Sequence, residues 1–418
     1  MNWYDSMAGT PDLAPDVQRF SIKGRVVLGD EPEFQAHLAE VYDTPERPRC
    51  LCVPGGVEMY VARHGKFLVK RMPGTGCKHH PACPSFEPEP QQSGLGELMG
   101  EAVLEPAPGL IQLRVDFPWS KTPGRSVTRG ESKDVTEAEA PRRRMSLRAL
   151  LHFLFERAGF NRWSPAMEGK RSQSVLHKYL LVAAEDVHVK GTPLHERLYV
   201  PEAFSEATKA DAARRRREKL AVLRPHEGQS PLALVIGEFK ACEATSMGRR
   251  IWIRHMPDAP LLAANKTWER IERVFAPLFE MQAADHGYKV RLVLVALIKA
   301  RQEHTYEIEL ASLMTTNENW LPIEGAHELP LLQALVAQKR RFTRPLRYDA
   351  KAATVFPNAL LLDAGPTPVA LHVTTAFMAP KDRADKQRAA HDSGAWIWDT
   401  AEPMPTLPAP MPYRSKLG

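Results

Sequence analysis

The sequence lacks any apolar run long enough to cross a membrane. Its longest apolar stretches, at residues 292–298 and 359–362, have the length of a strand, whereas a bilayer span needs about 20 residues. Residues 1–15 contain two aspartates and two prolines, without the basic start and apolar middle of a secretory signal. We therefore expect a cytoplasmic protein with no membrane partner.

Cysteine is also scarce, with 5 residues in a chain of 418. An odd number of cysteines without a secretion signal argues against a disulfide framework. Four of the five nevertheless lie in one short segment, at positions 50, 52, 77 and 83. This clustering is the most informative feature of the sequence.

A large excess of charge of either sign is missing too. The chain has 56 Lys and Arg against 50 Asp and Glu, a net charge of +6 and a pI of about 9.0. Such a charge permits nucleic acid as a partner, but ordinary solubility explains it equally well. Hydrophobic residues make up 43% of the chain, which excludes disorder throughout and provides for a packed core.

Periodicity and turn residues predict an α+β protein of several parts. Residues 20–118 contain short alternating runs broken by Gly and Pro, whereas residues 146–158 and 173–185 carry apolar residues at helical spacing. These two helices fit either a winged-helix-like unit or a plain helical pair, and we favour the plain pair. The predicted parts are a β-rich zinc-binding domain at 20–118, a linker at 119–145, a mainly helical region at 146–225, a mixed α/β domain at 226–379 and a proline-rich tail at 380–418.

The cysteine segment combines thiols with imidazoles at short spacing. It reads CLC at residues 50–52 and GCKHHPAC at residues 76–83, with two strand-like runs between them that could form a hairpin. Zinc prefers four tetrahedral thiolate and imidazole ligands, which usually come in two closely spaced sets. We therefore predict a structural zinc site, for which the spacing leaves six candidates: Cys50, Cys52, Cys77, His79, His80 and Cys83.

One strand ends in a Glu-x-Lys pattern that magnesium-dependent nucleases also use. Residues 232–240 are apolar up to Glu238 and Lys240, which alternation along a strand would place on one face. The segment before this strand offers no Asp, and Asp363, much later, precedes a strand without Glu and Lys. We interpret Glu238 and Lys240 as surface charges and keep a nuclease site as the alternative.

Two arginine runs could contact phosphates. The second run lies on a charged helical segment, and such a run is more often a solvated face. The candidate nucleic-acid-binding residues are Arg142, Arg143, Arg144, Arg214, Arg215, Arg216 and Arg217.

Several short blocks together resemble a bacterial family labelled domain of unknown function 1173. The resemblance extends from about residue 49 to about residue 408. The blocks include Cys50-Leu51-Cys52, His79-x-Pro81-x-Cys83, Gly169-Lys170-Arg171, Ile236-Gly237-Glu238, His255-Met256-Pro257-Asp258, Asn319-Trp320 and Arg340-Arg341-Phe342.

The resemblance selects among the zinc candidates. The family's C-x-C and H-x-P-x-C pattern falls on Cys50, Cys52, His79 and Cys83, which leaves Cys77 and His80 outside the ligand set. The resemblance also implies an origin in plasmids and integrative conjugative elements, and it implies no catalytic role for Glu238 or Lys240. We expect a zinc-stabilised accessory protein of a mobile genetic element that acts by binding rather than by catalysis.

The expected partners are DNA, RNA or the proteins of conjugation and replication. Two alternatives remain at this point. One is a metal-dependent nuclease that uses Glu238 and Lys240. The other is a protein-binding scaffold whose proline-rich tail is the docking segment.

Overall fold

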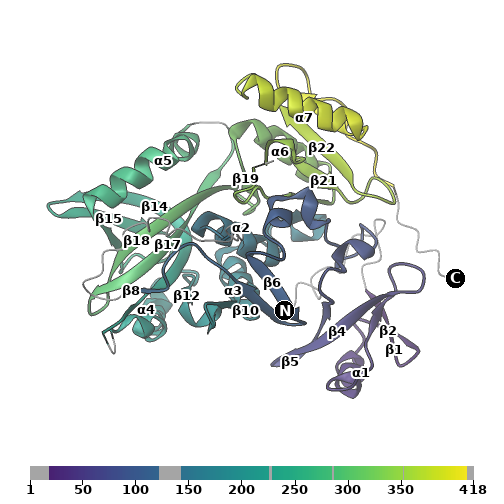
Figure 1. Ribbon diagram of the computed structural model, residues 1–418, viewed down its shortest axis with the longest axis horizontal. Helices are drawn as coiled ribbons and strands as arrows, with labels where there is room; N and C mark the ends of the chain where they lie inside the picture. Colours follow the sequence, from purple (N-terminus) through teal and green to yellow (C-terminus); the bar gives the residue numbers. More distant parts are fainter. Residues whose placement is uncertain (1–17, 122–142, 226–227, 285–286, 352, 412–418) are drawn as a thin grey trace, which may run out of the picture.

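The computed structural model describes residues 18–121, 143–225, 228–284, 287–351 and 353–411, without the side chain of His64. The chain forms a mixed α/β structure with several sheets, which agrees with the predicted mixture of helices and strands. Figure 1 shows a small N-terminal module at one end and a long-stranded sheet at the other, with the C-terminal segments between and above them. None of the helices described is both long and apolar enough to cross a bilayer.

The N-terminal module, residues 18–87, is built on an antiparallel five-stranded sheet. Helix α1 (Phe34–Val41) packs against β1 and β5 and buries Leu38 and Val41. The predicted hairpin between the two cysteine segments is confirmed, since all of β5 pairs with residues 59–64 of β4 around Gly65. In the order β2-β1-β3-β4-β5, the strands are β1 (Arg19–Ile22), β2 (Arg25–Leu28), β3 (Arg49–Cys50), β4 (Val57–His64) and β5 (Lys66–Arg71).

Helix α2 (Leu147–Arg157) forms the centre of the main core. The Ser146 hydroxyl accepts a hydrogen bond from the backbone of Ala149 and so caps its N-terminus. Helix α3 (Gln173–Ala184) packs beside α2 and is capped in the same way by Ser172. Nearly every side chain of α2 is buried, so α2 lies inside the protein and is not presented to a partner.

A second sheet joins chain segments from both sides of the predicted linker. Strand β7 pairs in parallel with β10, and residues 122–142 of the linker lie outside the described residues. The sheet consists of β6 (Val103–Ala107), β7 (Leu110–Leu113), β10 (Val187–Val189) and β11 (Thr192–Pro193). A short pair of strands, β8 (Ser120–Lys121) and β13 (Ser230–Pro231), lies nearby.

The largest sheet closes on itself, because β14 pairs with both β15 and β17. A bulge between Phe239 and Ala241 marks the point where β14 leaves β17 and continues along β15. Helix α5 (Asn265–Ala283) covers one face and α2 the other. The strands are β12 (Leu198–Tyr199), β14 (Ala233–Thr245), β15 (Gly248–Ile253), β16 (Leu261–Ala263), β17 (Val290–Gln302), β18 (Thr305–Asn317) and β19 (Pro322–Ile323).

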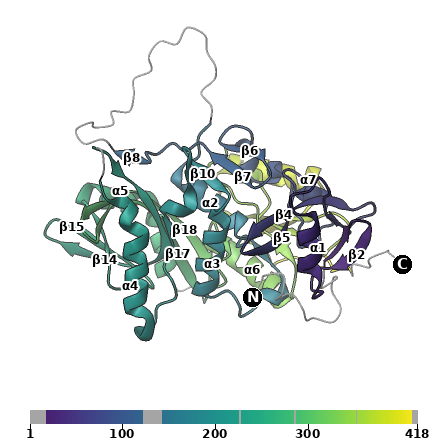
Figure 2. The ribbon, with the colours of Figure 1, turned by 90° about the horizontal axis from the view of Figure 1, so that it is seen from below.

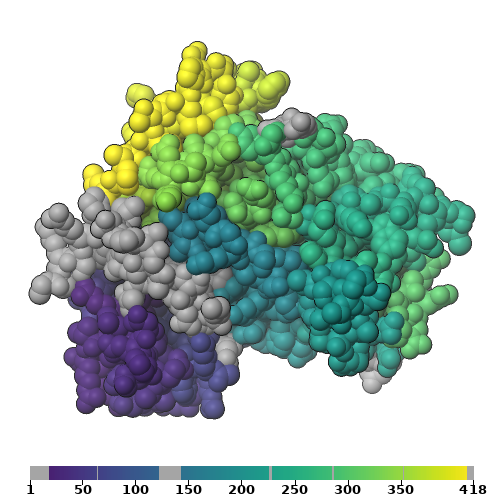
Figure 3. Space-filling view, turned by 180° about the vertical axis from the view of Figure 1, so that it is seen from behind, coloured from purple at the N-terminus to yellow at the C-terminus, as the bar shows by residue number. Residues whose placement is uncertain are grey.

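Helix α4 (Lys209–Lys219) runs along the outside of this part of the molecule (Figure 2). In the space-filling view of Figure 3, the N-terminal module occupies one end of the molecule and the chain around residues 200–260 the opposite end. The N-terminal module and α4, which carries the second arginine run, therefore lie far apart.

The C-terminal sheet includes one strand that lies much earlier in the sequence than the others. Strand β9 (Arg162–Trp163) pairs with β20, and β21 and β22 form an antiparallel pair. Helices α6 (Leu329–Ala337) and α7 (Pro380–Asp392) accompany this sheet. Its remaining strands are β20 (Phe342–Thr343), β21 (Ala359–Leu361), β22 (Val369–Thr374) and β23 (Trp396–Asp399).

The segment expected to be a tail from residue 380 is structured up to residue 411. It forms α7 and β23, and the proline-rich part returns along the C-terminal sheet, where the carbonyls of Thr406 and Pro408 accept bonds from Trp396 and Arg340. Proline lacks an N–H but keeps its carbonyl acceptor, so proline content alone does not prevent such anchoring.

The cores do not follow the predicted domain boundaries. One buried cluster runs from Leu98 through α2 and the large sheet to Tyr348, and so draws on every predicted part except the tail. The reason is that β7, β9 and β10 pair with strands distant in sequence, which composition along the chain does not reveal.

Candidate metal centre

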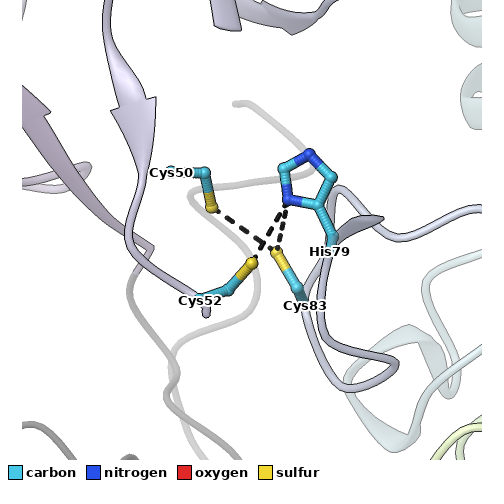
Figure 4. A group of neighbouring side chains, drawn as sticks. All are labelled: Cys50, Cys52, His79 and Cys83. Atoms are coloured by element: carbon cyan, nitrogen blue, oxygen red, sulfur yellow. Dashed lines mark hydrogen bonds between the residues drawn. The ribbon is translucent and has the colours of Figure 1, made fainter. Parts of the chain in front are cut away.

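Three thiols and one imidazole converge in the N-terminal module. Sulfur and nitrogen atoms of Cys50, Cys52, His79 and Cys83 all lie within 4.8 Å of one another (Figure 4). The Sγ atoms of Cys50 and Cys83 are 3.7 Å apart, and His79 Nδ1 lies 3.3 Å from Cys52 Sγ and 3.8 Å from Cys83 Sγ. The four residues are therefore close enough to hold one metal ion.

The first two ligand candidates come from the end of a strand and the turn after it. Cys50 is the last residue of β3 and pairs with Phe20 of β1 and Val57 of β4, which fixes its backbone on both sides. The chain then reverses through Gly55 and Gly56, both with positive φ, a conformation that glycine adopts without strain. Cys52 lies in this turn. The two cysteines of the C-x-C pattern thus lie at the end of a strand and in the turn that follows it.

The other two come from a loop that follows the β4–β5 hairpin. His79 follows a short 3₁₀ turn, Gly76–Lys78, and Cys83 closes the next turn, where its N–H donates to the carbonyl of His80. The ends of this loop touch, because the N–H of Glu87 donates to the carbonyl of Gly76 over 3.1 Å. A Cβ on Gly76 would lie 2.6 Å from the Cβ of Glu87, so this contact requires glycine.

The thiols strongly affect one another's ionisation. Hydrogen bonds with Cys52 and Cys83, and then burial, raise the pKa of the Cys50 thiol well above its usual value, while contacts with Cys50 and Cys83 lower the pKa of Cys52. The bond with Cys50 acts to lower the pKa of Cys83, but contact with Cys52 and burial raise it to about 12. A thiolate in this cluster thus disfavours the ionisation of the neighbouring thiols, because like charges repel. A divalent cation would remove that repulsion.

Cys77 and His80, the two other candidates, lie outside the cluster. Cys77 is exposed, and His80 Nδ1 accepts a hydrogen bond from the N–H of Ala82 within its own turn. The structure therefore brings together the four residues that the family resemblance selected.

Gln18 is a member of the site that sequence reasoning missed. Its Nε2 donates to the sulfurs of Cys83, at 3.5 Å, and Cys50, at 3.8 Å, and to the Ser85 hydroxyl, at 2.9 Å. Such donors around a metal site orient the ligands and reduce the negative charge on sulfur. No sequence signal could have found Gln18, because it is 32 residues from Cys50 and joins it only through the fold.

Glu238 is buried, so its interpretation as a surface charge is wrong, whereas Lys240 is exposed. Glu238 is 3% exposed, and its two carboxylate oxygens are engaged by Arg254 at 2.9 Å and Arg291 at 2.8 Å. Lys240 is exposed and lies at the bulge of β14, which breaks the expected alternation. Both oxygens that a magnesium ion would need are thus occupied by arginines.

Removing the Glu238 carboxylate is expected to change stability rather than any metal-dependent activity. In Glu238→Ala the Arg291 guanidinium stays largely buried without its partner, which we expect to destabilise the fold by about 3 kcal/mol. Denaturant unfolding measures this loss, and Arg254→Ala, whose side chain is 48% exposed, is the milder control. DNA cleavage with Mg²⁺ or Mn²⁺ that disappears in Glu238→Ala would contradict the structural role and support the nuclease.

Asp363 is likewise held by arginine. Its carboxylate accepts two hydrogen bonds from Arg340, at 2.8 and 3.1 Å, and one from the N–H of Arg341 at 2.7 Å. Both side chains of the Asp363–Arg340 pair are buried. Asp363, the third candidate catalytic residue, is therefore part of a structural ion pair in the C-terminal sheet.

Most of the second arginine run is neutralised by carboxylates. Arg214 pairs with Asp211 and Glu218, Arg215 forms a two-pronged pair with Glu202, and the buried Arg216 pairs with Asp258. Arg217 is exposed, and no ion pair is recorded for it in the described part of the chain. Of the four arginines of this run predicted to contact phosphates, only Arg217 is thus exposed and without an ion pair in the described part of the chain.

The first run is described only in part. Arg142 lies outside the described residues, and Arg143 pairs with Glu97. Arg144 is exposed, and within the residues described it has no recorded ion pair.

A mixed α/β fold with a Cys₃His cluster defines this protein as one with a candidate metal centre in its N-terminal module. The chain belongs to the family described as Protein of unknown function (DUF1173), whose model matches residues 20–401. The family resemblance of the sequence is thereby confirmed. Neither the curated proteins nor the solved structures contain a match to the chain.

Proposed function

We propose that the cluster of Cys50, Cys52, His79 and Cys83 binds one structural zinc ion. The observation that carries this proposal is the geometry of the donor atoms. Tetrahedral zinc with sulfur at about 2.3 Å requires ligand atoms about 3.8 Å apart. The recorded separations of 3.7, 3.3 and 3.8 Å lie close to that value.

The composition and burial of the site favour a structural over a catalytic role. Four protein ligands complete a tetrahedron and leave no position for water or substrate. Three of the four residues are buried and the fourth is partly buried. Soft thiolates favour zinc over magnesium or calcium, which prefer oxygen ligands.

The protein as a whole is proposed to act by binding, with nucleic acid as the first candidate partner. Residues 143–224 hold 17 Lys and Arg against 9 Asp and Glu, so the basic excess of the chain is concentrated there. Among the described residues, Arg144 and Arg217, both exposed, are the candidate phosphate contacts that remain. Conjugation or replication proteins, and an origin in a mobile genetic element, are part of the same proposal through the family resemblance.

The scaffold alternative receives less support from the fold. Its docking segment would be the proline-rich tail, yet residues 400–411 are anchored to the C-terminal sheet through Trp396 and Arg340. Leu407 within this segment is buried.

Salt dependence tests the nucleic-acid proposal. Each phosphate contact contributes a slope of about 0.9 in log affinity against log salt for duplex DNA. Arg144→Ala combined with Arg217→Ala is expected to reduce the slope by about 2, measured by fluorescence anisotropy with a labelled duplex and a labelled single strand.

Arg215→Ala is the matched control on the same helix, because Glu202 already neutralises that guanidinium. Its slope should equal that of the unmodified protein. An unmodified protein that fails to bind either nucleic acid at low salt would exclude this partner class, and equal slopes for all variants would exclude these two arginines.

A further inference from the structure

The loop that carries two of the ligand candidates also connects the N-terminal module to the rest of the protein. Arg162, in β9 of the C-terminal sheet, donates to the carbonyl of Pro84 at 3.3 Å and pairs with Glu87 at 3.3 Å. Pro84 is the residue directly after Cys83. A single arginine of the body, the part of the chain after residue 87, thus contacts this loop next to Cys83 and at the loop's end.

Charges of both parts meet at Glu87. Arg71 of β5 pairs with the Glu87 carboxylate from the module, and Arg162 pairs with the same oxygen from the body. Partial burial alone would raise the pKa of Glu87, yet the positive charges of Arg71, Arg162 and Arg157 hold it below its usual value. Glu87 therefore stays ionised and acts as a bridge between the two arginines.

A second contact between module and body lies away from the loop. Lys70 of β5 pairs with Asp186 at 2.7 Å, and Arg157 at the end of α2 approaches the same carboxylate at 3.6 Å. Leu362 of the body packs against the module's core cluster, which includes Cys50 and Cys83. The loop contact can thus be altered while this second contact remains.

The position of Pro84 and Glu87 depends on how well the loop is held. Two turns, the closure at Gly76 and the bonds from Gln18 to Cys83 and Ser85 hold the loop from within the module. An ion shared by His79, Cys83 and the β3 turn would join the loop to the sheet at a point one residue from Pro84.

We infer that the metal centre controls the docking of the N-terminal module on the body through Arg162. Metal binding orders the loop in the form that presents the Pro84 carbonyl and the Glu87 carboxylate to Arg162. Because linkage between two equilibria is reciprocal, docking through Arg162 in turn strengthens metal binding. This inference rests on the proposal that the cluster binds zinc.

The test measures zinc affinity in a variant that leaves all four ligand residues in place. Arg162→Met is expected to weaken zinc binding by about five- to tenfold, the lower range of typical coupling between sites. The full-length protein is titrated with zinc in competition with a chromophoric chelator. Glu87→Gln removes the same bridge from the loop side and should weaken binding similarly, and circular dichroism verifies that both variants are folded.

Two controls separate the loop contact from docking in general. Arg148→Met removes a half-exposed arginine of α2 that pairs with Glu324, away from the module, and should leave zinc affinity unchanged. Lys70→Met weakens the second contact and should have a smaller effect than Arg162→Met.

Hydrogen exchange gives a second readout in the unmodified protein. Removal of zinc should speed exchange in β9 as well as in the loop, although β9 contains no ligand. A protein that binds zinc with the same affinity in folded Arg162→Met and Glu87→Gln would overturn this inference alone. A protein that binds no zinc would overturn the proposed metal site as well.

Discussion

Replacing Cys83 by serine is expected to abolish stable zinc binding and to lower the free energy of unfolding by about 4 kcal/mol or more. Cys83 is buried, it contacts both Cys50 and His79, and it belongs to the core cluster of the N-terminal module. A structural zinc contributes its binding free energy to folding, about 10–16 kcal/mol in small zinc-binding peptides. Elemental analysis and denaturant unfolding of the purified chain measure both effects.

The chain offers a matched control in Cys77. This cysteine lies in the same loop but is exposed and outside the cluster. Cys77→Ser should therefore keep about one zinc per chain and unchanged stability. Equal zinc content and equal stability in Cys77→Ser and Cys83→Ser would show that the cluster holds no structural metal.

Replacing Asp363 by alanine is expected to destabilise the C-terminal sheet by about 3–5 kcal/mol. The side chain of Arg340 is 3% exposed and would lose its only recorded carboxylate partner in the described chain, which leaves a buried charge without compensation. The N–H of Arg341 would lose its acceptor as well. Denaturant unfolding measures the loss of stability.

The same substitution should loosen the proline-rich segment, because Arg340 also holds the carbonyl of Pro408. Limited proteolysis is expected to cut residues 400–411 of Asp363→Ala sooner than those of the unmodified protein. Lys209→Ala, which removes an exposed ion pair with Glu206, should shift stability by less than about 0.5 kcal/mol. Equal stability of the two variants would contradict the structural role of Asp363.

Local chemistry was predictable from the sequence because it depends on neighbouring residues. The helices α2 and α3 and the β4–β5 hairpin around Gly65 follow from periodicity and turn residues. The four residues of the cluster could be selected only with the family pattern, since spacing alone left Cys77 and His80 in competition with them.

What could not be predicted are contacts between residues distant in sequence. Arg291 reaches Glu238 across 53 positions, and Arg340 reaches Asp363 across 23. A Glu-x-Lys pattern has the same letters whether the carboxylate faces a metal or two arginines. The bulge at Phe239, which exposes Lys240, arises where β14 changes its partner strand and has no local signature.

The domain boundaries failed to coincide with the cores for the same reason. The polar segment at 119–145 resembles a linker in composition, yet β7 before it pairs with β10 after it. The composition of a segment indicates its exposure to solvent. The grouping of strands into sheets depends instead on pairing between segments that are distant in sequence.

X-ray absorption spectroscopy at the zinc edge tests the central claim most directly. The full-length protein, purified without added metal, should show about one zinc per chain with three sulfur neighbours at about 2.3 Å and one nitrogen neighbour at about 2.0 Å. Cys77→Ser, which lies outside the cluster, should leave the sulfur count at three. A zinc-free protein of full stability, or a zinc surrounded mainly by oxygen, would contradict the account.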